Sequence, residues 1–71
     1  MEKIYIRDDF IKLGQAMKLG AMVGSGVEAK ILIQDGQVKV NGETCTMRGK
    51  KIYPGDIISF DGQEAMVDRN K

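Results

Sequence analysis

The spacing of apolar residues near the N-terminus predicts a short strand followed by a helix. Residues 3–7 are rich in β-forming types, which indicates a short strand. Phe10, Leu13 and Met17 then recur at the helical spacing i, i+3 and i+7, so we expect them on one buried helix face. The two aspartates at residues 8–9 precede this helix as candidate N-caps.

Two glycines mark the interior and the end of this first helix. Gly14 lies on or near the apolar face, where a glycine costs roughly 1 kcal/mol relative to alanine. We therefore expect another backbone segment to approach closely at Gly14. Gly20 is the predicted C-terminal stop.

A second helix is predicted to begin after Ser25. Ser25 and Glu28 have the S-x-x-E spacing of a capping box, in which the hydroxyl accepts from the N–H of residue 28 and the carboxylate accepts from the N–H of Ser25. An apolar stripe follows at residues 29–33, and Asp35 and Gly36 end the helix. The short connection between the two helices predicts an αα-hairpin.

After Gly36 the apolar period becomes two, which indicates strands. Val38 and Val40 share one face and Lys39 takes the other, while Asn41 and Gly42 predict a type I′ hairpin turn. The further predicted strands are residues 43–46, 52–53, 57–60 and 64–67, separated by a basic loop at 47–50 and turns at 54–56 and 61–62. The order β-α-α-β-β-β-β predicts an α+β domain, with the αα-hairpin packed on a small, mostly antiparallel sheet.

Composition narrows the possible chemistry. The 71 residues include no histidine and one cysteine, which excludes a histidine triad, a histidine metal ligand and an internal disulfide. No stretch approaches the roughly 20 apolar residues of a membrane span, and the N-terminus does not have the pattern of a signal peptide. We expect a cytoplasmic protein that does not bind membranes.

The remaining polar residues predict no catalytic centre. Cys45 has no histidine partner and lies on a predicted strand, where a cysteine is usually a small apolar residue. The carboxylates fall at predicted caps and turns, which explains them without acid–base chemistry. The Gly-Ser-Gly run at residues 24–26 lacks the spacing of a nucleotide-binding P-loop. We therefore expect no enzymatic activity, no metal and no cofactor.

Charge is distributed unevenly along a nearly neutral chain. Residues 12–51 hold seven basic and three acidic side chains, a net charge of +4, whereas the two ends are acidic and the whole chain carries +1. The turn before the second helix offers free N–H groups beside these cations, so the middle of the chain can form a phosphate-binding surface. The alternative, that Ser25 only caps and the lysines only solvate the surface, stays open.

Aromatic residues bear on the kind of nucleic acid recognised. Phe10 and Phe60 are predicted in the core, which leaves Tyr5 and Tyr53 for stacking on bases. Single-strand binders usually offer a larger stacking platform. We therefore expect recognition of backbone and helix shape rather than of splayed bases.

Four segments together resemble the S4 RNA-binding domain family. They are KLGQAMKLG at residues 12–20, GSGVEAKILIQDG at 24–36, QVKVNG at 37–42 and KIYPGD at 51–56. The family pattern is a helix pair, then I-x-x-G-x-V-x-V-N-G, then K-x-x-P-G-D, and it matches about residues 10–60. The likeness is greatest to short stand-alone bacterial members of the YaaA and YbcJ type, which implies one S4-like (alpha-L) domain over residues 1–71.

The resemblance implies a non-catalytic protein that binds structured RNA, either rRNA or tRNA, in association with the ribosome and as a monomer. Family contacts come from the start of the first helix, the first half of the second and the strand after it. The residues implied here, with the basic loop added, are Lys12, Gln15, Ser25, Gly26, Lys30, Lys39, Arg48, Lys50 and Lys51. The alternative is a protein-interaction module of the same fold, favoured by Gly26 where the wider family usually has arginine.

Overall fold

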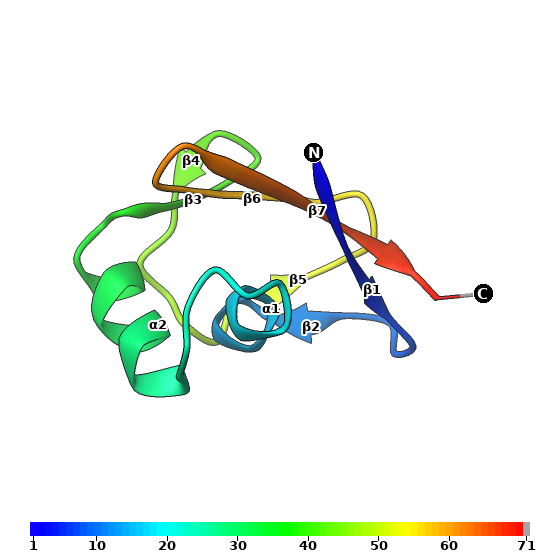
Figure 1. Cartoon of the computed structure of the whole chain (residues 1–71), viewed down its shortest axis with the longest axis horizontal. Helices are drawn as coiled ribbons and strands as arrows, with labels where there is room; N and C mark the ends of the chain where they lie inside the picture. Colours follow the sequence, from blue (N-terminus) through cyan, green and yellow to red (C-terminus); the bar gives the residue numbers. More distant parts are fainter. Residues whose placement is uncertain (71) are drawn as a thin grey trace.

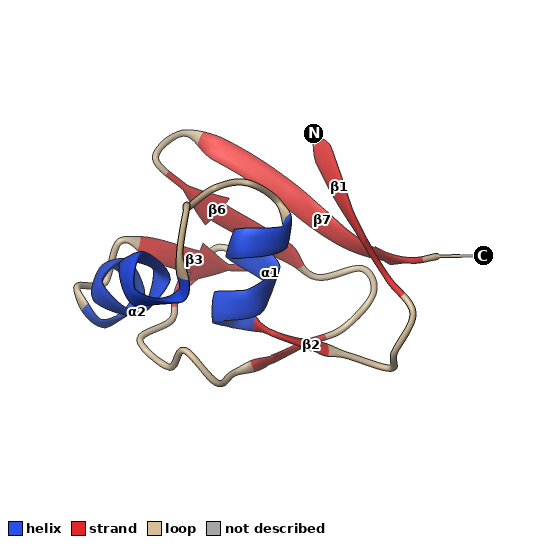
Figure 2. Ribbon diagram, turned by 60° about the horizontal axis from the view of Figure 1, so that its bottom comes forward, coloured by secondary structure: helices blue, strands red, loops and turns tan. Residues whose placement is uncertain are grey.

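The computed structural model describes residues 1–70 as two helices and two sheets (Figure 1). The elements are β1 (Glu2–Ile6), β2 (Ile11–Lys12), α1 (Leu13–Leu19), α2 (Gly26–Gln34), β3 (Val38–Val40), β4 (Glu43–Thr44), β5 (Lys51–Ile52), β6 (Ile57–Phe60) and β7 (Gln63–Arg69). The five-stranded sheet has the order β1-β7-β6-β3-β4, and β2 pairs with β5 in a separate ribbon. Both helices and this ribbon lie on one side of the large sheet (Figure 1, Figure 2). The predicted α+β class is confirmed.

The first and last strands along the chain, β1 and β7, pair with each other in the large sheet. β1 runs parallel to β7, with Ile4 opposite Val67, whereas the pairs β6–β7, β3–β6 and β3–β4 are antiparallel. β6 supplies partners for the first part of β7, and β1 supplies partners for its second part. This second partner explains why β7 extends beyond the predicted residues 64–67.

The prediction for the start of the first helix was wrong. Phe10 precedes β2, α1 begins only at Leu13, and the N-cap residue is Lys12, which makes no side-chain capping bond. The aspartates at residues 8–9 therefore do not cap the helix. The Leu13 N–H instead donates to the carbonyl of Lys50 at 2.9 Å. A loop distant in sequence therefore supplies the acceptor for an N–H in the first turn of the helix. Local spacing cannot reveal such a partner.

The two helices end near the predicted glycines. Gly20 is the C-cap of α1, although its φ is −81° and the left-handed residue is Ala21, with φ 59°. Asp35 is the C-cap of α2, and Gly36 follows it with a positive φ of 79°. A glycine suits that left-handed position because it has no β-carbon to clash with the backbone.

The alternation and the turn predicted after α2 are confirmed. Val38 and Val40 are buried, and Lys39 between them is exposed. Asn41 and Gly42 have φ values of 52° and 84°, as a type I′ turn requires. The return strand β4 is shorter than the predicted residues 43–46, although the Cys45 N–H beyond it still donates to the Val38 carbonyl at 3.0 Å.

One hydrophobic core lies between the large sheet and the elements that cover it. Its largest fully buried side chains are Leu13, Met17, Ile33, Val38, Ile52, Ile58 and Val67. Phe60, predicted in the core, is partly buried and packs against this cluster. The helices, the ribbon and the sheet all contribute to the cluster, so it fixes their relative positions and those of the residues on their outer surfaces.

Candidate functional site

A cavity of about 360 Å³ opens among α1, the start of α2 and the loop between β4 and β5. The residues that line it are Lys12, Gly14, Gln15, Lys18, Gly26, Arg48 and Gly49. Three of them are cationic and none is acidic. The fold therefore concentrates positive charge at one place on a chain whose formal net charge is only +1. We call these three cations, Lys12, Lys18 and Arg48, the cavity cations.

Helix α1 directs two polar side chains to the cavity. Leu13, Ala16 and Met17 are completely buried against the core, so Gln15 and Lys18 fall on the opposite, exposed side of the helix. Lys18 lies in the last turn of α1, where the unpaired carbonyls of the helix end favour a cation. Because the buried apolar side chains of α1 face the core, Lys18 lies on the exposed side of the helix.

Arg48 reaches the cavity by lying across Gly14. The Gly14 N–H donates to the Arg48 carbonyl at 3.1 Å, and a β-carbon placed on Gly14 would lie 2.7 Å from Cγ of Arg48. Real β-carbons essentially never come so close to a neighbouring atom. The predicted close approach at Gly14 is therefore confirmed, and the approaching group includes the arginine side chain.

A carboxylate already lies at the N-terminus of α2. The Glu28 N–H donates to Oγ of Ser25 at 3.2 Å, which confirms the first half of the predicted capping box. In the second half the Glu28 carboxylate accepts from the N–H of Gly24 at 3.3 Å, not from that of Ser25. This arrangement leaves the N–H of Gly26 at the cavity without an intrahelical partner. The Gly26 N–H therefore adds a hydrogen-bond donor to the cavity beside the cavity cations, while the Glu28 carboxylate offsets part of the positive charge at the helix end.

Lys39 lies on the other face of the large sheet. It alternates with the buried Val38 and Val40, and it lines a separate cavity with Ser59 and Glu64. The sheet separates this position from the helices, which cover the opposite face (Figure 1). The structure therefore does not bring Lys39 together with the other sequence-predicted site residues.

Three more of those residues surround the cavity without lining it. Ser25 caps α2 immediately before Gly26. Lys30 is exposed one helical turn beyond Gly26, on the same side of α2. Lys50 lies in the same loop as Arg48 but lines a different hollow, next to β4. Lys30 thus adds a cation beyond the cavity along α2, whereas Lys50 shares its hollow with Glu43.

Lys51, the last of the sequence-predicted residues, lies beside two aromatic rings. Its ammonium nitrogen is 4.8 Å from the ring centroid of Phe10, which is within cation–π range. The Phe10 and Tyr53 rings are 5.9 Å apart between centroids and tilted by 48°. The sequence assigned Phe10 to the core, but the ring is only partly buried because α1 starts three residues later.

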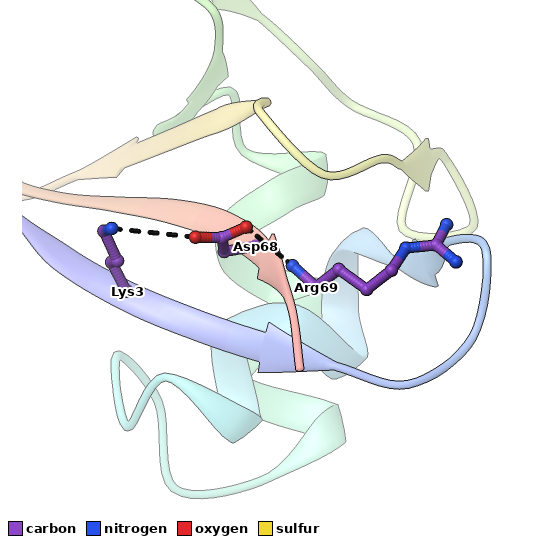
Figure 3. Close-up of polar contacts among 3 residues, drawn as sticks. All are labelled: Lys3, Asp68 and Arg69. Carbon is purple, nitrogen blue, oxygen red and sulfur yellow. Dashed lines mark hydrogen bonds and ion pairs between the residues drawn. The ribbon is translucent and has the colours of Figure 1, made fainter. Parts of the chain in front are cut away.

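Two cations on strands β1 and β7 are paired with carboxylates. Lys3 lies 3.6 Å from Asp68 across the β1–β7 pair, and Arg69 lies 3.4 Å from Asp9. Figure 3 shows Asp68 between Lys3 and the backbone of Arg69, whose N–H donates to it at 2.8 Å. Within residues 1–70 no ion pair involves the cavity cations. Those cations therefore keep their charge available for a ligand.

Lys18 is the one cavity cation that the sequence did not lead us to predict, and the lining residues Gly14 and Gly49 were also absent from the predicted set. The place of Lys18 at the cavity was predictable from the sequence, because Lys18 lies three residues after Gln15 and therefore on the same side of a helix.

Within residues 1–70 there is no cluster of side chains suited to a metal ion. No helix in the same range is long and apolar enough to cross a membrane.

Comparisons with known proteins place this chain in a family. The family model for the S4 domain matches residues 4–68. A Bacillus subtilis protein named "Probable ribosome maturation protein RlbA" is 39% identical over 83% of this chain and 83% of its own length. YbcJ of Escherichia coli is 40% identical over 80% of this chain and 81% of its own length.

A solved structure supports the same relationship in three dimensions. The solution structure of Escherichia coli YbcJ is described as revealing an αL motif involved in RNA binding. It superposes with a TM-score of 0.74 at 35% identity, covering 96% of this chain and 87% of that one. The family match over residues 4–68 and this shared architecture agree, and the chain belongs to the S4 domain family.

Proposed function

We propose that this chain is a non-catalytic RNA-binding protein that recognises structured RNA through phosphate contacts at the cavity. The observation that carries the proposal is the convergence of Lys12, Lys18 and Arg48 on one cavity that has no acidic lining residue. Arginine can hold a phosphate through two parallel N–H groups, and lysine acts as a mobile point charge. Such contacts release counterions from RNA and favour binding.

Ribosomal RNA is the class of target that the relatives favour. One relative is named for ribosome maturation, and another has a structure described in terms of RNA binding. A polyanion that folds compactly presents phosphates from more than one strand, which suits cations brought together from α1 and a distant loop. We propose that the protein acts in the cytoplasm as a monomer, without a cofactor, and over residues 1–71 as one domain.

The proposed surface differs from the one implied by resemblance alone. Its centre is formed by the cavity cations with Gln15 and Gly26, and Lys30, Lys50 and Ser25 extend it. Lys39 is left out, because it lies on the far face of the sheet beside Glu64. Neutralising Lys18 in one variant and Lys39 in another therefore distinguishes RNA binding at the cavity from a general effect of positive charge.

A protein-interaction module is the second candidate function. The exposed face of α2 carries Val27 and Ile31 one turn apart, with 69% and 62% of their surfaces exposed. Apolar side chains at that spacing can contact a protein partner. This candidate predicts a different outcome in the experiment that tests RNA binding.

The direct experiment compares two RNAs of the same composition, one a folded fragment of rRNA and the other a single strand. Fluorescence anisotropy measures binding at low and at physiological salt. We expect the folded RNA to bind more tightly and the binding to weaken as salt increases. Absence of binding to both RNAs at low salt would contradict the proposal and favour the protein-interaction module.

A further inference from the structure

The β2–β5 ribbon has one face toward the core and one toward solvent. Its antiparallel register places Ile11 opposite Ile52 and Lys12 opposite Lys51. Ile52 is completely buried and Ile11 packs against the core, so the isoleucines mark the inner face. Both lysines are exposed and therefore lie on the outer face.

The outer face continues into an aromatic pair. Phe10 immediately precedes β2, and Tyr53 immediately follows β5. The centroids of their two rings are 5.9 Å apart. Lys51 lies over the Phe10 ring at 4.8 Å, which places this lysine and the aromatic pair on the same face. Two lysines and two aromatic rings thus share one small surface.

This surface is held in place before any ligand binds. The Tyr53 N–H donates to a carboxylate oxygen of Asp56 at 2.8 Å, and the other oxygen of Asp56 accepts from the side-chain amide of Asn41 at 3.0 Å. Tyr53 nevertheless keeps 47% of its surface exposed. A half-exposed ring on a hydrogen-bonded backbone and beside the Phe10 ring can receive another flat ring with little loss of conformational freedom.

The two lysines favour an anionic ligand on the ribbon, while Asp8 and Asp9 line the hollow beside Phe10 and Lys12. Lys12 and Lys51 are directly opposite each other in the ribbon, an arrangement of like charges that destabilises a sheet unless an anion lies between them. An apolar protein segment would bury both ammonium groups without compensation. A nucleotide matches both features, because its base stacks on an aromatic ring and its phosphate neutralises the lysines.

We propose that the outer face of the β2–β5 ribbon is a binding subsite for one unpaired nucleotide of the RNA. The base stacks on Tyr53, whose ring packs at a tilt of 48° against Phe10, and the phosphate lies between Lys12 and Lys51. Lys12 also lines the cationic cavity, so the subsite is continuous with the surface that binds structured RNA. This inference rests on the proposed function, and it adds stacking of one base, without a preference for its identity, to recognition of backbone and shape.

The test uses the full chain and two RNA hairpins, one blunt and one with a short unpaired extension that carries a fluorescent adenine analogue. We expect the wild-type protein to bind the extended hairpin more tightly and to quench the analogue by stacking. Tyr53→Leu, which keeps apolar bulk but removes the flat ring, should weaken binding of the extended hairpin by about 5- to 150-fold. Tyr53→Phe should retain both the affinity and the quenching.

The blunt hairpin separates this inference from the proposed function. Its binding should be the same for wild type and Tyr53→Leu, which also shows that the variant is folded. Equal affinity for the two hairpins, with no quenching and no effect of Tyr53→Leu, would overturn the stacking subsite and leave the proposed function intact. Absence of binding to either hairpin would overturn both.

Discussion

The aliphatic part of Arg48 lies directly over the backbone of Gly14. A β-carbon on Gly14 would lie 2.7 Å from Cγ and 3.3 Å from Cδ of Arg48, and the Gly14 N–H donates to the Arg48 carbonyl at 3.1 Å. The glycine therefore fixes the backbone of the loop on α1 and leaves room for the arginine to cross the helix. It links the packing of α1 to the charge of the cavity.

Gly14→Ala should weaken RNA binding with little effect on stability. The new methyl group displaces the Arg48 side chain, while alanine improves helix propensity by about 1 kcal/mol and offsets the cost of that displacement. We expect the free energy of unfolding to change by less than about 1 kcal/mol. Denaturant unfolding and fluorescence anisotropy with the folded rRNA fragment measure the two effects.

A double-mutant cycle tests whether this effect passes through Arg48. If Gly14 only positions the arginine, Gly14→Ala should weaken RNA binding in the wild type and have no further effect in the Arg48→Ala background. Additive losses of binding free energy would show that Gly14 acts independently of Arg48.

Gly26 offers a site where RNA affinity should increase. A β-carbon there would meet no atom within 4 Å, and Gly26 lines the cavity, so a side chain can begin at this position without a clash. We expect Gly26→Arg to maintain or tighten binding to the folded RNA, and Gly26→Glu to weaken it through like-charge repulsion with phosphate. Gly26→Ala is the control for the change in backbone freedom. No difference between the arginine and glutamate variants would exclude phosphate contact at this position.

Patterns of local spacing were sufficient for most of the fold. The turn at Asn41 and Gly42, the alternation around Lys39 and the cap from Ser25 all depend on residues that are neighbours in sequence. The start of α1 was mispredicted because its first N–H groups bond to the carbonyls of Arg48 and Lys50, far along the chain. The spacing of residues 10–17 contains no information about that contact.

The candidate site was only partly predictable for the same reason. The basic residues were identifiable, but the sequence does not say on which side of the sheet each one lies. Lys39 follows the rule of strand alternation and therefore faces away from the helices, whereas Lys18 joins the cavity through helix geometry. The position of Phe10 beside Tyr53 depends on the β2–β5 pairing, which no local pattern indicated.

Asn41→Ala should be among the more destabilising polar substitutions. The Asn41 side chain accepts from the N–H of Ile57 at 2.9 Å and donates to Asp56 at 3.0 Å, and its φ is 52°. Loss of these bonds and the cost of a left-handed alanine together predict a loss of about 2–3 kcal/mol in unfolding free energy. Asp61→Ala is the matched control, because Asp61 also has a φ of 52° and makes no side-chain hydrogen bond within residues 1–70.

The Asp61 variant should lose about 1 kcal/mol, the conformational part of the effect. Equal losses from the two substitutions would show that the Asn41 side-chain bonds contribute nothing to stability. Because Asp56 also accepts from the Tyr53 N–H, Asn41→Ala should in addition loosen Tyr53, which amide hydrogen exchange at residue 53 measures.

Ser25→Ala should lower the free energy of unfolding by about 1 kcal/mol, because the Glu28 N–H loses its capping acceptor. Denaturant unfolding gives this value directly. Ser59→Ala is the matched control, since its hydroxyl bonds only the exposed Glu64, at 3.4 Å, and should change stability by less than about 0.5 kcal/mol. An unchanged unfolding midpoint for Ser25→Ala would mean that the cap does not stabilise α2.

The central claim is that RNA phosphates bind at the cavity cations, and the salt dependence of binding tests it most directly. Three phosphate contacts predict a slope of log K against log salt concentration of about −3 for the folded rRNA fragment. Lys18→Gln should reduce this slope to about −2, whereas Lys39→Gln, on the far face of the sheet, should leave it at about −3. The same slope for wild type and Lys18→Gln, or an equal reduction by the two substitutions, would contradict binding at the cavity.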